Sequence, residues 1–509
     1  MRRTSFRLPF SVAAFIAFVL LASSPVFADD AQNHFDKATA LYKAKKYDAS
    51  LEEFNLARKA SPQNANILFW VGFLNLQMQR YPDALEPLQE AIKIKPDVPE
   101  AHLNLGNVFD GLKRYDEAAQ EFQTAAKLQP KSPDPYYNLG GVYYKMNRMP
   151  DAITAYRKAA ALNPNDAIIQ QNLGLALQAN GSYDGAIDAL QTAVKIEPNN
   201  TGAWVSLGLA GQSLARKSQT LATEKGKADA ERGWNLARTA LNRAITLAPT
   251  DYPIRETYAE SLFDMGRTAD AIPQFAKATD LKPDAFDPRN NLGLAYTRLQ
   301  QYPLAVTAYQ KALASNPENP ESLRGLGLAQ FHLKHFDEAA VIFGRLAKAQ
   351  PAEIGNWINL SSSLQRKGDD VGAIAALEEA LKNATPGAKS AQARRALAGY
   401  HYRKGDTDSL TRAETEYNQS LQEAPDNADA YNGLGLIAQK QEKFDEAVRF
   451  FLRAVALNPN YADAYNNLGV AYESKRSFDL AAGAYKKALH IDPNNALARK
   501  NLDRFKKTP

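Results

Sequence analysis

The sequence predicts an all-α solenoid of about 13 helix-turn-helix repeats, because prolines recur along the chain with a period of 34 residues. Within each period, a small residue, an alanine and a large apolar residue keep fixed distances from the proline. This is the pattern expected of two helices that pack on each other and end at a turn. The prolines fall in three runs: Pro62, Pro96, Pro130, Pro164 and Pro198; Pro249, Pro283, Pro317 and Pro351; Pro425, Pro459 and Pro493.

The small residue marks the place where the two helices of a repeat cross. Counting Pro130 as position 32 of its repeat, position 8 is Gly106 and position 24 is Phe122. A glycine costs roughly 1 kcal/mol relative to alanine inside a helix, so its repeated use needs a packing reason. Two helices approach to about 8 Å only where the side chains at the crossing are small. Position 8 is occupied by Ala38, Gly72, Gly106, Gly140, Gly174, Gly208, Ala259, Gly293, Gly327, Ser361, Ala398, Gly435 and Gly469.

The second helix of each repeat carries an alanine at position 20 and is followed by the proline, which stops the helix and stiffens the next turn. Two residues depart from this pattern: Ser50 replaces the alanine in the first repeat, and Leu346 stands where a small residue is usual. The alanines are Ala84, Ala118, Ala152, Ala186, Ala237, Ala271, Ala305, Ala339, Ala373, Ala413, Ala447 and Ala481.

Residues 1–28 have the features of a signal peptide. Three arginines precede an apolar run from Phe10 to Leu21, and Val26 and Ala28 occupy the positions that a signal peptidase reads. The run is too short to span a membrane stably, and no other stretch reaches about 18 apolar residues. No cysteine follows the cleavage site, which excludes a bacterial lipoprotein anchor. We therefore expect cleavage after Ala28 and a periplasmic or secreted protein with no membrane span.

The charge balance gives no reason to expect nucleic acid as a partner. The chain has 61 basic and 56 acidic residues, and removal of the three arginines of the signal segment leaves 58 basic residues against 56. A nucleic-acid-binding surface would need a clear basic excess.

The N-terminal block, residues 29–249, holds about six repeats, and the sixth is longer than the others. Pro198 and Pro249 are 51 residues apart, 17 more than the period. The excess near residues 216–232 is rich in helix formers and has a plausible turn at Gly226, so we expect a charged hairpin that projects by about two turns. It is either a solvated spacer or a docking element.

The C-terminal block, residues 250–493, holds about seven repeats, followed by a capping helix over residues 494–509. The eleventh repeat, about residues 391–427, carries a short insert at residues 407–412 and is expected to be the most irregular.

These residues closely resemble the tetratricopeptide repeat family over nearly the whole chain after residue 28. The resemblance implies a right-handed superhelix in which the first helix of each repeat lines the concave face through positions 2, 5, 6, 9, 12 and 13. At these positions the first six repeats are apolar and aromatic, and repeats eight to twelve are basic. The former are Phe35, Tyr42, Phe69, Phe73, Leu76, Leu103, Tyr137, Tyr144, Ile168, Leu175, Val205 and Leu209; the latter are Arg298, Arg324, His332, Arg366, Arg395, Arg403 and Lys440.

Two polar features lie at the same positions. Glu256, Glu260 and Asp264 form an acidic stripe on one helix, which either contacts a ligand or is neutralised by Arg298. Asparagines recur at position 6 and resemble the ladder in the repeat domain of O-linked N-acetylglucosamine transferase. They either bind the backbone of an extended peptide or bond locally. They are Asn104, Asn138, Asn172, Asn291, Asn359 and Asn467.

The chain lacks the clamp by which cytosolic chaperone-binding members of the family hold a terminal carboxylate. No repeat has lysine at position 5, and Arg324 and Arg395 at that position are followed by Leu328 and Gly399 where the clamp needs asparagine.

We expect no enzyme activity, no cofactor and no metal site. The histidines are scattered over different repeats, and the neighbouring His332 and His335 have no third ligand. The GlyLeuGly segments at Gly325 and Gly433 lie within predicted helices, whereas a phosphate loop follows a strand.

The sequence therefore predicts a non-catalytic scaffold of the bacterial cell envelope that binds a protein or an extended peptide in its concave groove. The alternative is a periplasmic module that binds carbohydrate or assists polysaccharide export, since aromatic rings stack on sugars and basic groups suit an acidic polymer. The oligomeric state stays open. The residues expected to contact the ligand are Asn104, Asn138, Asn172, Asn291, Asn359, Phe69, Phe73, Tyr137, Tyr144, Arg324, Arg366, Arg395 and Arg403.

Overall fold

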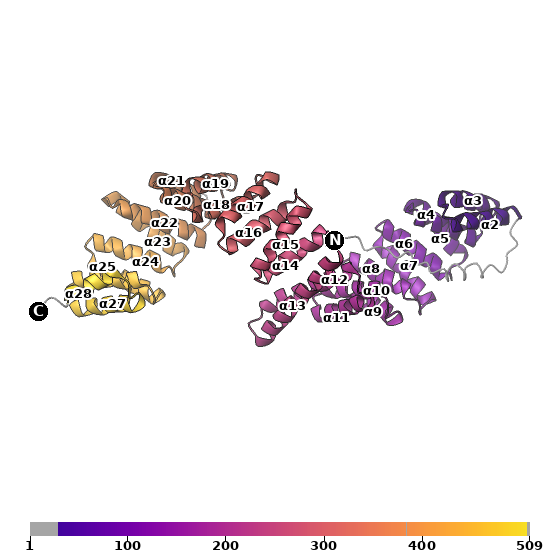
Figure 1. The fold of residues 1–509 in the computed structure, drawn as a ribbon, viewed down its shortest axis with the longest axis horizontal. Coiled ribbons are helices and arrows are strands. Elements are labelled where there is room, and N and C mark those ends of the chain that lie inside the picture. Colours follow the sequence, from indigo (N-terminus) through magenta and orange to yellow (C-terminus); the bar gives the residue numbers. More distant parts are fainter. Residues whose placement is uncertain (1–28, 383, 506–509) are drawn as a thin grey trace. The chain divides into compact units, whose positions relative to one another are not determined.

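The computed structural model describes residues 29–382 and 384–505, where the chain forms helices and no strand (Figure 1). The all-α solenoid is confirmed: α2 to α27 follow one another along the chain as the first and second helices of thirteen repeats, and α28 (Ala496–Phe505) comes after them. The first helices are α2 (Asp29–Lys43), α4 (Ala65–Gln77), α6 (Pro99–Gly111), α8 (Asp134–Lys145), α10 (Ala167–Ala179), α12 (Thr201–Gln219), α14 (Tyr252–Asp264), α16 (Phe286–Arg298), α18 (Pro320–His332), α20 (Ile354–Lys367), α22 (Ala388–Lys404), α24 (Ala428–Lys440) and α26 (Ala462–Ser474).

Each first helix is followed by the second helix of its repeat. The second helices are α3 (Tyr47–Ala60), α5 (Tyr81–Ile94), α7 (Tyr115–Leu128), α9 (Met149–Leu162), α11 (Tyr183–Ile196), α13 (Glu224–Leu247), α15 (Thr268–Leu281), α17 (Tyr302–Ser315), α19 (Phe336–Ala349), α21 (Asp370–Leu381), α23 (Thr407–Glu423), α25 (Phe444–Leu457) and α27 (Phe478–Ile491).

The chain divides into two compact units, Met1–Gly266 and Arg267–Pro509. The division falls between α14 and α15, inside the seventh repeat, whereas the sequence blocks divide at 249/250, after the hairpin repeat. The predicted signal peptide lies outside the described residues. Within the described part, no helix is long and apolar enough to cross a membrane.

The predicted helix crossing is present within the repeats. A β-carbon built on Gly106 would lie 2.6 Å from Cε1 of Phe122, and one built on Gly435 would lie 2.6 Å from Cε1 of Phe451. Position 8 therefore faces position 24 of the same repeat, and the large side chain occupies the space that glycine leaves open. The alanine at position 20 is fully buried beside this contact, as Ala118 illustrates.

The proline carbonyls have a role that sequence analysis missed. In several repeats the side chain at position 4 lies beside the carbonyl oxygen of the proline six residues earlier and satisfies this acceptor in the turn between repeats. The contacts are His102 Nε2 with Pro96 O (2.9 Å), Gln170 Nε2 with Pro164 O (3.4 Å), Trp204 Nε1 with Pro198 O (2.9 Å), Arg255 Nη2 with Pro249 O (2.7 Å), Trp357 Nε1 with Pro351 O (3.1 Å) and Arg499 Nη2 with Pro493 O (2.5 Å).

The sixth repeat forms the expected helical hairpin, with α12 of 19 residues and α13 of 24. The prediction of a turn at Gly226 is wrong. The turn comes earlier because Thr223 caps α13, its Oγ1 accepting a hydrogen bond from Gly226 N at 3.0 Å. Gly226 is instead needed for close packing, since a β-carbon there would lie 2.8 Å from Cβ of Leu221.

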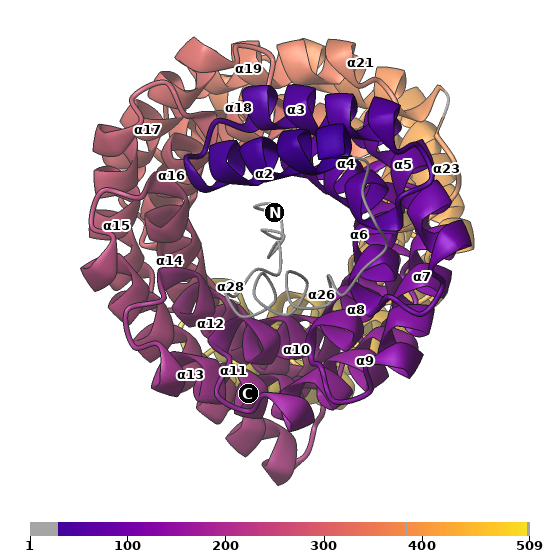
Figure 2. The same cartoon turned by 90° about the vertical axis from the view of Figure 1, so that its right-hand side faces the viewer.

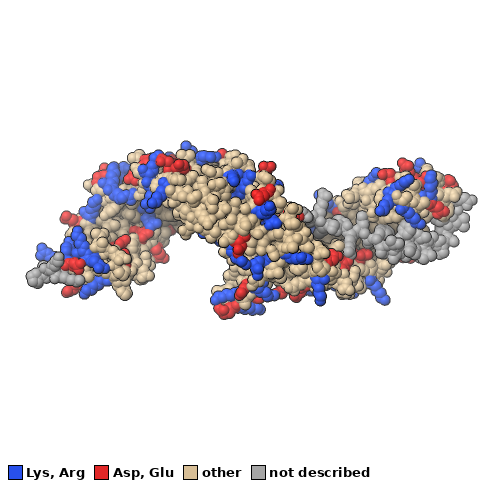
Figure 3. All heavy atoms as spheres, in the orientation of Figure 1, with Lys and Arg blue, Asp and Glu red and all other residues tan. Residues whose placement is uncertain are grey.

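The hairpin is tied to the neighbouring repeats at its base. Arg216 forms an ion pair with Asp264, and Gln212 Nε2 donates to the same carboxylate at 3.2 Å. On the other side, Arg232 pairs with Asp184. The projecting end carries charges of both signs (Figure 3).

The eleventh repeat is irregular, as expected, but the sixth departs further from the regular length. Helices α22 and α23 have 17 residues each. Ser420, at position 27 of this repeat, is buried and donates to the carbonyl of Ala391 at 2.8 Å. Ser50, the other serine at a small-residue site, donates likewise to Ala38 O at 2.8 Å. Both hydroxyls are thus satisfied inside the helix pair.

Candidate functional site

The first helices of the repeats line the inner side of each compact unit. Consecutive first helices contact one another directly, as α8 does with α10 and α22 with α24. In the first compact unit, Figure 2 shows α6, α8 and α10 on the inner side of the curve and α7, α9 and α11 outside them. In the second unit, α16 and α18 lie inside α17 and α19 in the same view. We call the surface formed by the first helices the inner face.

Polar side chains 35 residues apart link neighbouring first helices. Position 5 pairs with position 6 of the next repeat, and position 12 pairs with position 13. The two members of each pair belong to different repeats, so the pattern within a single repeat of the sequence does not reveal this register. The pairs are Asn172 Nδ2 with Tyr137 Oη (3.2 Å), Gln171 Nε2 with Ser206 Oγ (3.3 Å), Gln178 Nε2 with Ser213 Oγ (3.0 Å), Lys145 Nζ with Asp110 Oδ1 (2.7 Å), Asn467 Nδ2 with Asn432 Oδ1 (3.0 Å) and Asn501 Nδ2 with Asn466 Oδ1 (3.0 Å).

This register changes the interpretation of the asparagines. Asn104 and Asn138, two of the asparagines expected to contact a ligand, are buried and only 3% and 7% exposed. Asn138 Nδ2 donates to Asn107 Oδ1 at 3.3 Å, and Asn172 Nδ2 also donates to Ile168 O at 3.0 Å. Asn291 and Asn359 are half-buried. The local bonding that sequence analysis left open therefore accounts for several of these amides, and peptide binding through them stays a prediction.

The aromatic residues of the first repeats pack on one another. Phe69 and Phe73 are buried, with parallel rings 6.2 Å apart, and the Phe73 ring lies 5.9 Å from Tyr42. Tyr137 and Tyr144 are half-buried, and the Tyr137 ring lies 5.9 Å from Tyr156. The expected outward aromatic patch is therefore wrong for Phe69 and Phe73, because both rings are buried against other aromatic rings.

Aliphatic residues at position 9 remain partly accessible along the inner face. In the second compact unit, Leu294 of α16 is 43% exposed, and further members of the row are half-buried. The half-buried members are Leu175 and Leu209 in the first compact unit, and Leu328, Leu436 and Val470 in the second.

Two residues of the acidic stripe on α14 have contacts within their own compact unit. Asp264 contacts Arg216 and Gln212 from the hairpin, and Glu256 Oε1 accepts a hydrogen bond from Tyr252 Oη at 2.8 Å. Asp264 thus anchors the hairpin.

The arginines predicted for the inner face differ in how accessible their charges are. Arg395 forms an ion pair with Asp429, and Arg324 is half-buried. Arg366 and Arg403 are exposed, and Cζ of Arg403 lies 4.5 Å from the ring centroid of Tyr400.

Two further basic residues of the inner face, His332 and Lys440, also lie against rings. The His332 ring stacks on Tyr302 with centroids 4.5 Å apart, and Lys440 Nζ lies 5.4 Å from the Tyr402 centroid. Burial raises the pKa of both Tyr400 and Tyr402, which keeps their rings neutral at physiological pH.

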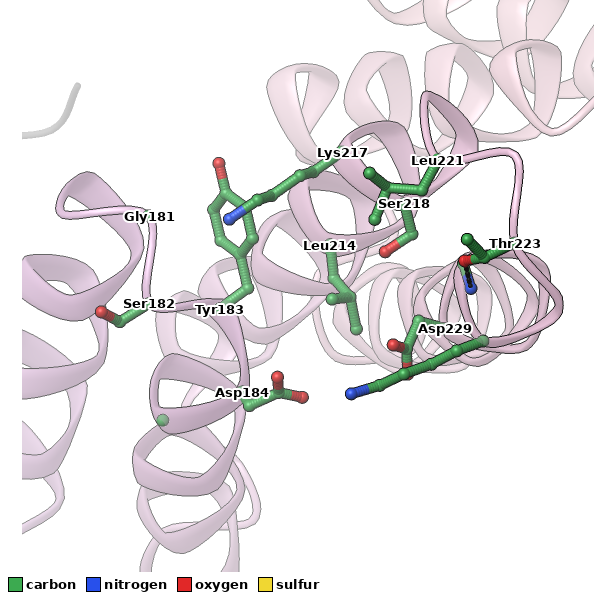
Figure 4. A pocket seen from close by; sticks show the side chains of 13 residues that line it. Gly181, Ser182, Tyr183, Asp184, Leu214, Lys217, Ser218, Leu221, Thr223 and Asp229 are labelled. Atoms are coloured by element: carbon green, nitrogen blue, oxygen red, sulfur yellow. Dashed lines mark hydrogen bonds between the residues drawn. The ribbon is translucent and has the colours of Figure 1, made fainter.

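A separate pocket of about 460 Å³ lies where the α12–α13 hairpin meets the start of α11 (Figure 4). Lys217 Nζ lies 5.2 Å from the Tyr183 ring, and Leu214, Leu221 and Thr223 come from the hairpin. Its charged groups are of both signs, including Asp184 and Asp229. The sequence signal for this pocket was the 17-residue excess in the sixth repeat.

Histidine and acidic residues form no cluster of three or more suited to a metal ion in the described part of the chain. The two histidines that are close in sequence each contact another residue. His332 stacks on Tyr302, and His335 Nδ1 lies 2.8 Å from Gln330 Oε1.

Models of one repeat family match most of the chain. Models described as tetratricopeptide repeat match residues 257–320, 290–354, 359–428, 408–461, 432–496 and 167–200. A model described as TPR repeat matches residues 76–113, 111–147 and 141–181.

Curated relatives resemble part of the chain. The peroxisomal targeting signal receptor of Yarrowia lipolytica is 30% identical over 160 residues, which is 30% of this chain and 26% of that protein. The Hsp70-Hsp90 organizing protein of Triticum aestivum is 33% identical over 87 residues, covering 17% of this chain and 15% of that protein. The chain thus spans about a quarter or less of the length of these relatives.

Among solved structures, the MamA protein is 25% identical and covers 33% of this chain and 93% of its own, with a TM-score of 0.32. YrrB, titled a TPR protein with an unusual peptide-binding site, is 23% identical and covers 40% of this chain and 97% of its own, with a TM-score of 0.33.

Proposed function

This chain belongs to the tetratricopeptide repeat family, and we propose that it is a non-catalytic protein-interaction scaffold that holds an extended segment of a partner protein against its inner face. Two curated relatives support a protein partner through their names, one a receptor for a targeting signal and the other an organizer of Hsp70 and Hsp90. The rest of the proposal comes from this chain's own residues.

The observation that carries the proposal is the position-9 row of aliphatic side chains. Leu294 is 43% exposed although its helix, α16, packs against both α17 and α18. The two helices of a repeat pack on each other through positions 8, 20 and 24, so a position-9 leucine is not needed to fill that contact. A partner segment laid across the first helices of the second compact unit would cover that unit's part of the row and remove apolar surface from water. The polar groups on either side would fix its direction.

The cell envelope is part of the proposal. The apolar run from Phe10 to Leu21 and the small residues before position 29 support export. Exported material should begin at Asp29, and N-terminal sequencing of the protein from fractionated cells tests this. An intact Met1 on protein from the cytoplasmic fraction would contradict the envelope location.

A carbohydrate ligand has less support. Sugar stacking needs open ring faces, and the rings of Phe69 and Phe73 pack on each other and on their neighbours.

Substitution of inner leucines tests the scaffold function. We would purify the tagged chain from its own host and measure which polypeptides co-purify with it at a constant molar ratio. Leu294→Ser combined with Leu328→Ser should remove the bound polypeptide. The matched control is Leu304→Ser combined with Val341→Ser, on the second helices of the same repeats, where the residues are 49% and 67% exposed. Equal retention by both variants would contradict the proposal, provided that thermal melting shows both to be folded.

A further inference from the structure

Three exposed cations follow one another along the inner face of the second compact unit. Arg366 lies on α20, Arg403 on α22 and Lys440 on α24, each at position 13 of its repeat and within the last two residues of its helix. Helix α20 contacts α22, and α22 contacts α24. We call these three residues the cation row.

The cation row differs from the other basic residues of α20 and α22 in having no ion pair among the described residues. Every other lysine and arginine of these two helices has a carboxylate partner. The pairs are Lys367 with Asp337, Lys389 with Glu353, Arg394 with Glu416 and Glu423, Arg395 with Asp429, and Lys404 with Asp406.

Two carboxylates near the row, Asp369 and Asp406, are engaged as helix caps. Asp369 and Asp406 begin the second helices that follow α20 and α22. Asp369 Oδ1 accepts from Gly372 N at 2.8 Å, and Asp406 Oδ1 accepts from Ser409 N at 2.9 Å. Both therefore serve as helix caps. A cation at a helix C-terminus gains from the helix dipole, which accounts for its sign but supplies no full counter-charge.

Aromatic rings position two of the cations without neutralising them. Cζ of Arg403 lies 4.5 Å from the Tyr400 centroid, and Lys440 Nζ lies 5.4 Å from the Tyr402 centroid. Such contacts hold a charged group over a ring face while the charge stays available to an anion. Both tyrosines belong to α22, so this helix supports two members of the row.

We propose that the cation row binds an acidic segment of a partner protein in extended conformation, with an acidic residue at every third position. The inference rests on the proposed function and names the chemistry of its partner. Neighbouring packed helices lie about 8 to 10 Å apart. An extended chain advances about 3.3 Å per residue, so every third residue advances about 10 Å and meets the next cation.

The spacing is tested with two labelled peptides of equal composition. The spaced peptide has glutamate at every third position of 12 residues, and the clustered peptide has its four glutamates in one run. Fluorescence anisotropy with the full-length chain should show tighter binding of the spaced peptide, and the affinity should fall as salt rises because exposed charges are screened. Equal affinity for both peptides would overturn the proposed spacing.

The site is tested by removing the row. Arg366→Gln, Arg403→Gln and Lys440→Gln together should weaken the spaced peptide about thirtyfold, at roughly threefold for each exposed ion pair. The matched control, Lys367→Gln with Lys389→Gln and Lys404→Gln, removes the same charge from paired positions and should change affinity less than twofold. Equal weakening by both triple variants would show general charge attraction and overturn the site.

A competition experiment tests whether the ligand of the cation row is a protein. A polygalacturonate of matched charge should compete only weakly, and competition as strong as that of the unlabelled spaced peptide would overturn the assignment to a protein. The cation-row inference can fail without failure of the proposed scaffold function, and the two outcomes can be told apart. If the cation-row variant still retains the polypeptide that Leu294→Ser with Leu328→Ser releases, the inference fails while the scaffold function stands.

Discussion

Arg403 lies over the ring of Tyr400, the residue three positions earlier on α22, with 4.5 Å between Cζ and the ring centroid. Tyr400 is buried and lies 3.4 Å from Ser361 through its hydroxyl, so the ring is held by the tenth repeat while it supports a cation on the eleventh. A contact between two repeats thus positions a residue of the inner face.

Loss of this ring should weaken the acidic peptide without removing any charge. Tyr400→Phe loses the hydroxyl contact with Ser361 but keeps the ring packed in its buried apolar cluster, and it should bind the spaced peptide as the parent does. Tyr400→Leu removes the ring face and should weaken binding by about two- to fivefold, because an exposed cation–π contact is worth roughly 0.5 to 1 kcal/mol. Anisotropy titrations compare them, and equal binding by both variants would show that the ring does not position Arg403.

Gly106→Ala should destabilise the third repeat. A β-carbon at this site would lie 2.6 Å from Cε1 of Phe122, which is fully buried and cannot move freely. Overpacking of this kind costs about 1 to 3 kcal/mol. Gly141→Ala is the matched control, since its nearest neighbour would be Tyr156 Oη at 3.6 Å, and helix propensity should then make it neutral or slightly stabilising. Urea denaturation measures both, and equal effects would refute the crossing assigned to position 8.

His102 should make stability depend on pH. Burial lowers the pKa of this imidazole, but hydrogen bonds with Glu121 and the Pro96 carbonyl outweigh burial and raise the pKa above its usual value. Since the folded pKa is raised, the stabilisation is fully present below about pH 6.5, the usual unfolded value, and is lost as pH rises through the folded pKa.

His102→Gln checks this dependence. Glutamine keeps a donor for Pro96 O, as Gln170 provides for Pro164 O in the fifth repeat, but it carries no charge. The free energy of unfolding should differ between parent and variant by about 1 kcal/mol near pH 5.5, and the difference should shrink as pH rises. A difference that stays constant from pH 5.5 to 8.5 would exclude a charged imidazole.

Helix α28 should protect the last repeat. Ala498 is fully buried, and Asn501 Nδ2 donates to Asn466 Oδ1 at 3.0 Å. Removal of residues 496–509 should expose the apolar side of α26 and α27 and cause fraying or aggregation, since terminal repeats need a polar cap. Removal of residues 506–509 alone is the control. Hydrogen exchange of α26 that is unchanged in the longer truncation would show that α28 is not a cap.

The helix crossing could be predicted from the sequence because it is a contact within one repeat. Gly106 and Phe122 face each other within one repeat, so their 16-residue separation is visible in the chain and recurs with the prolines. The hairpin length was likewise visible as a 17-residue excess. Its turn was misplaced because Gly226 is conspicuous in the sequence, while the hydroxyl of Thr223 is what caps α13.

The inner face was harder to predict because it depends on contacts between repeats. Asn172 bonds Tyr137 and Asn467 bonds Asn432, both 35 residues away. A single repeat of the sequence does not contain both partners, so the sequence alone left local bonding and peptide binding open for these amides. Arg395 and Arg403 looked alike in sequence. One is paired with Asp429 and the other is not, a difference that only the placement of neighbouring first helices reveals.

Site-specific photocross-linking in the native host tests the central claim most directly, that a partner protein occupies the inner face. A photoreactive residue would replace Leu294 on α16 or Leu304 on α17, which belong to the same repeat and are 43% and 49% exposed. We predict a discrete cross-linked polypeptide from Leu294 and none from Leu304. Cross-links from Leu304 alone, or equal cross-links from both positions, would contradict a partner bound on the inner face.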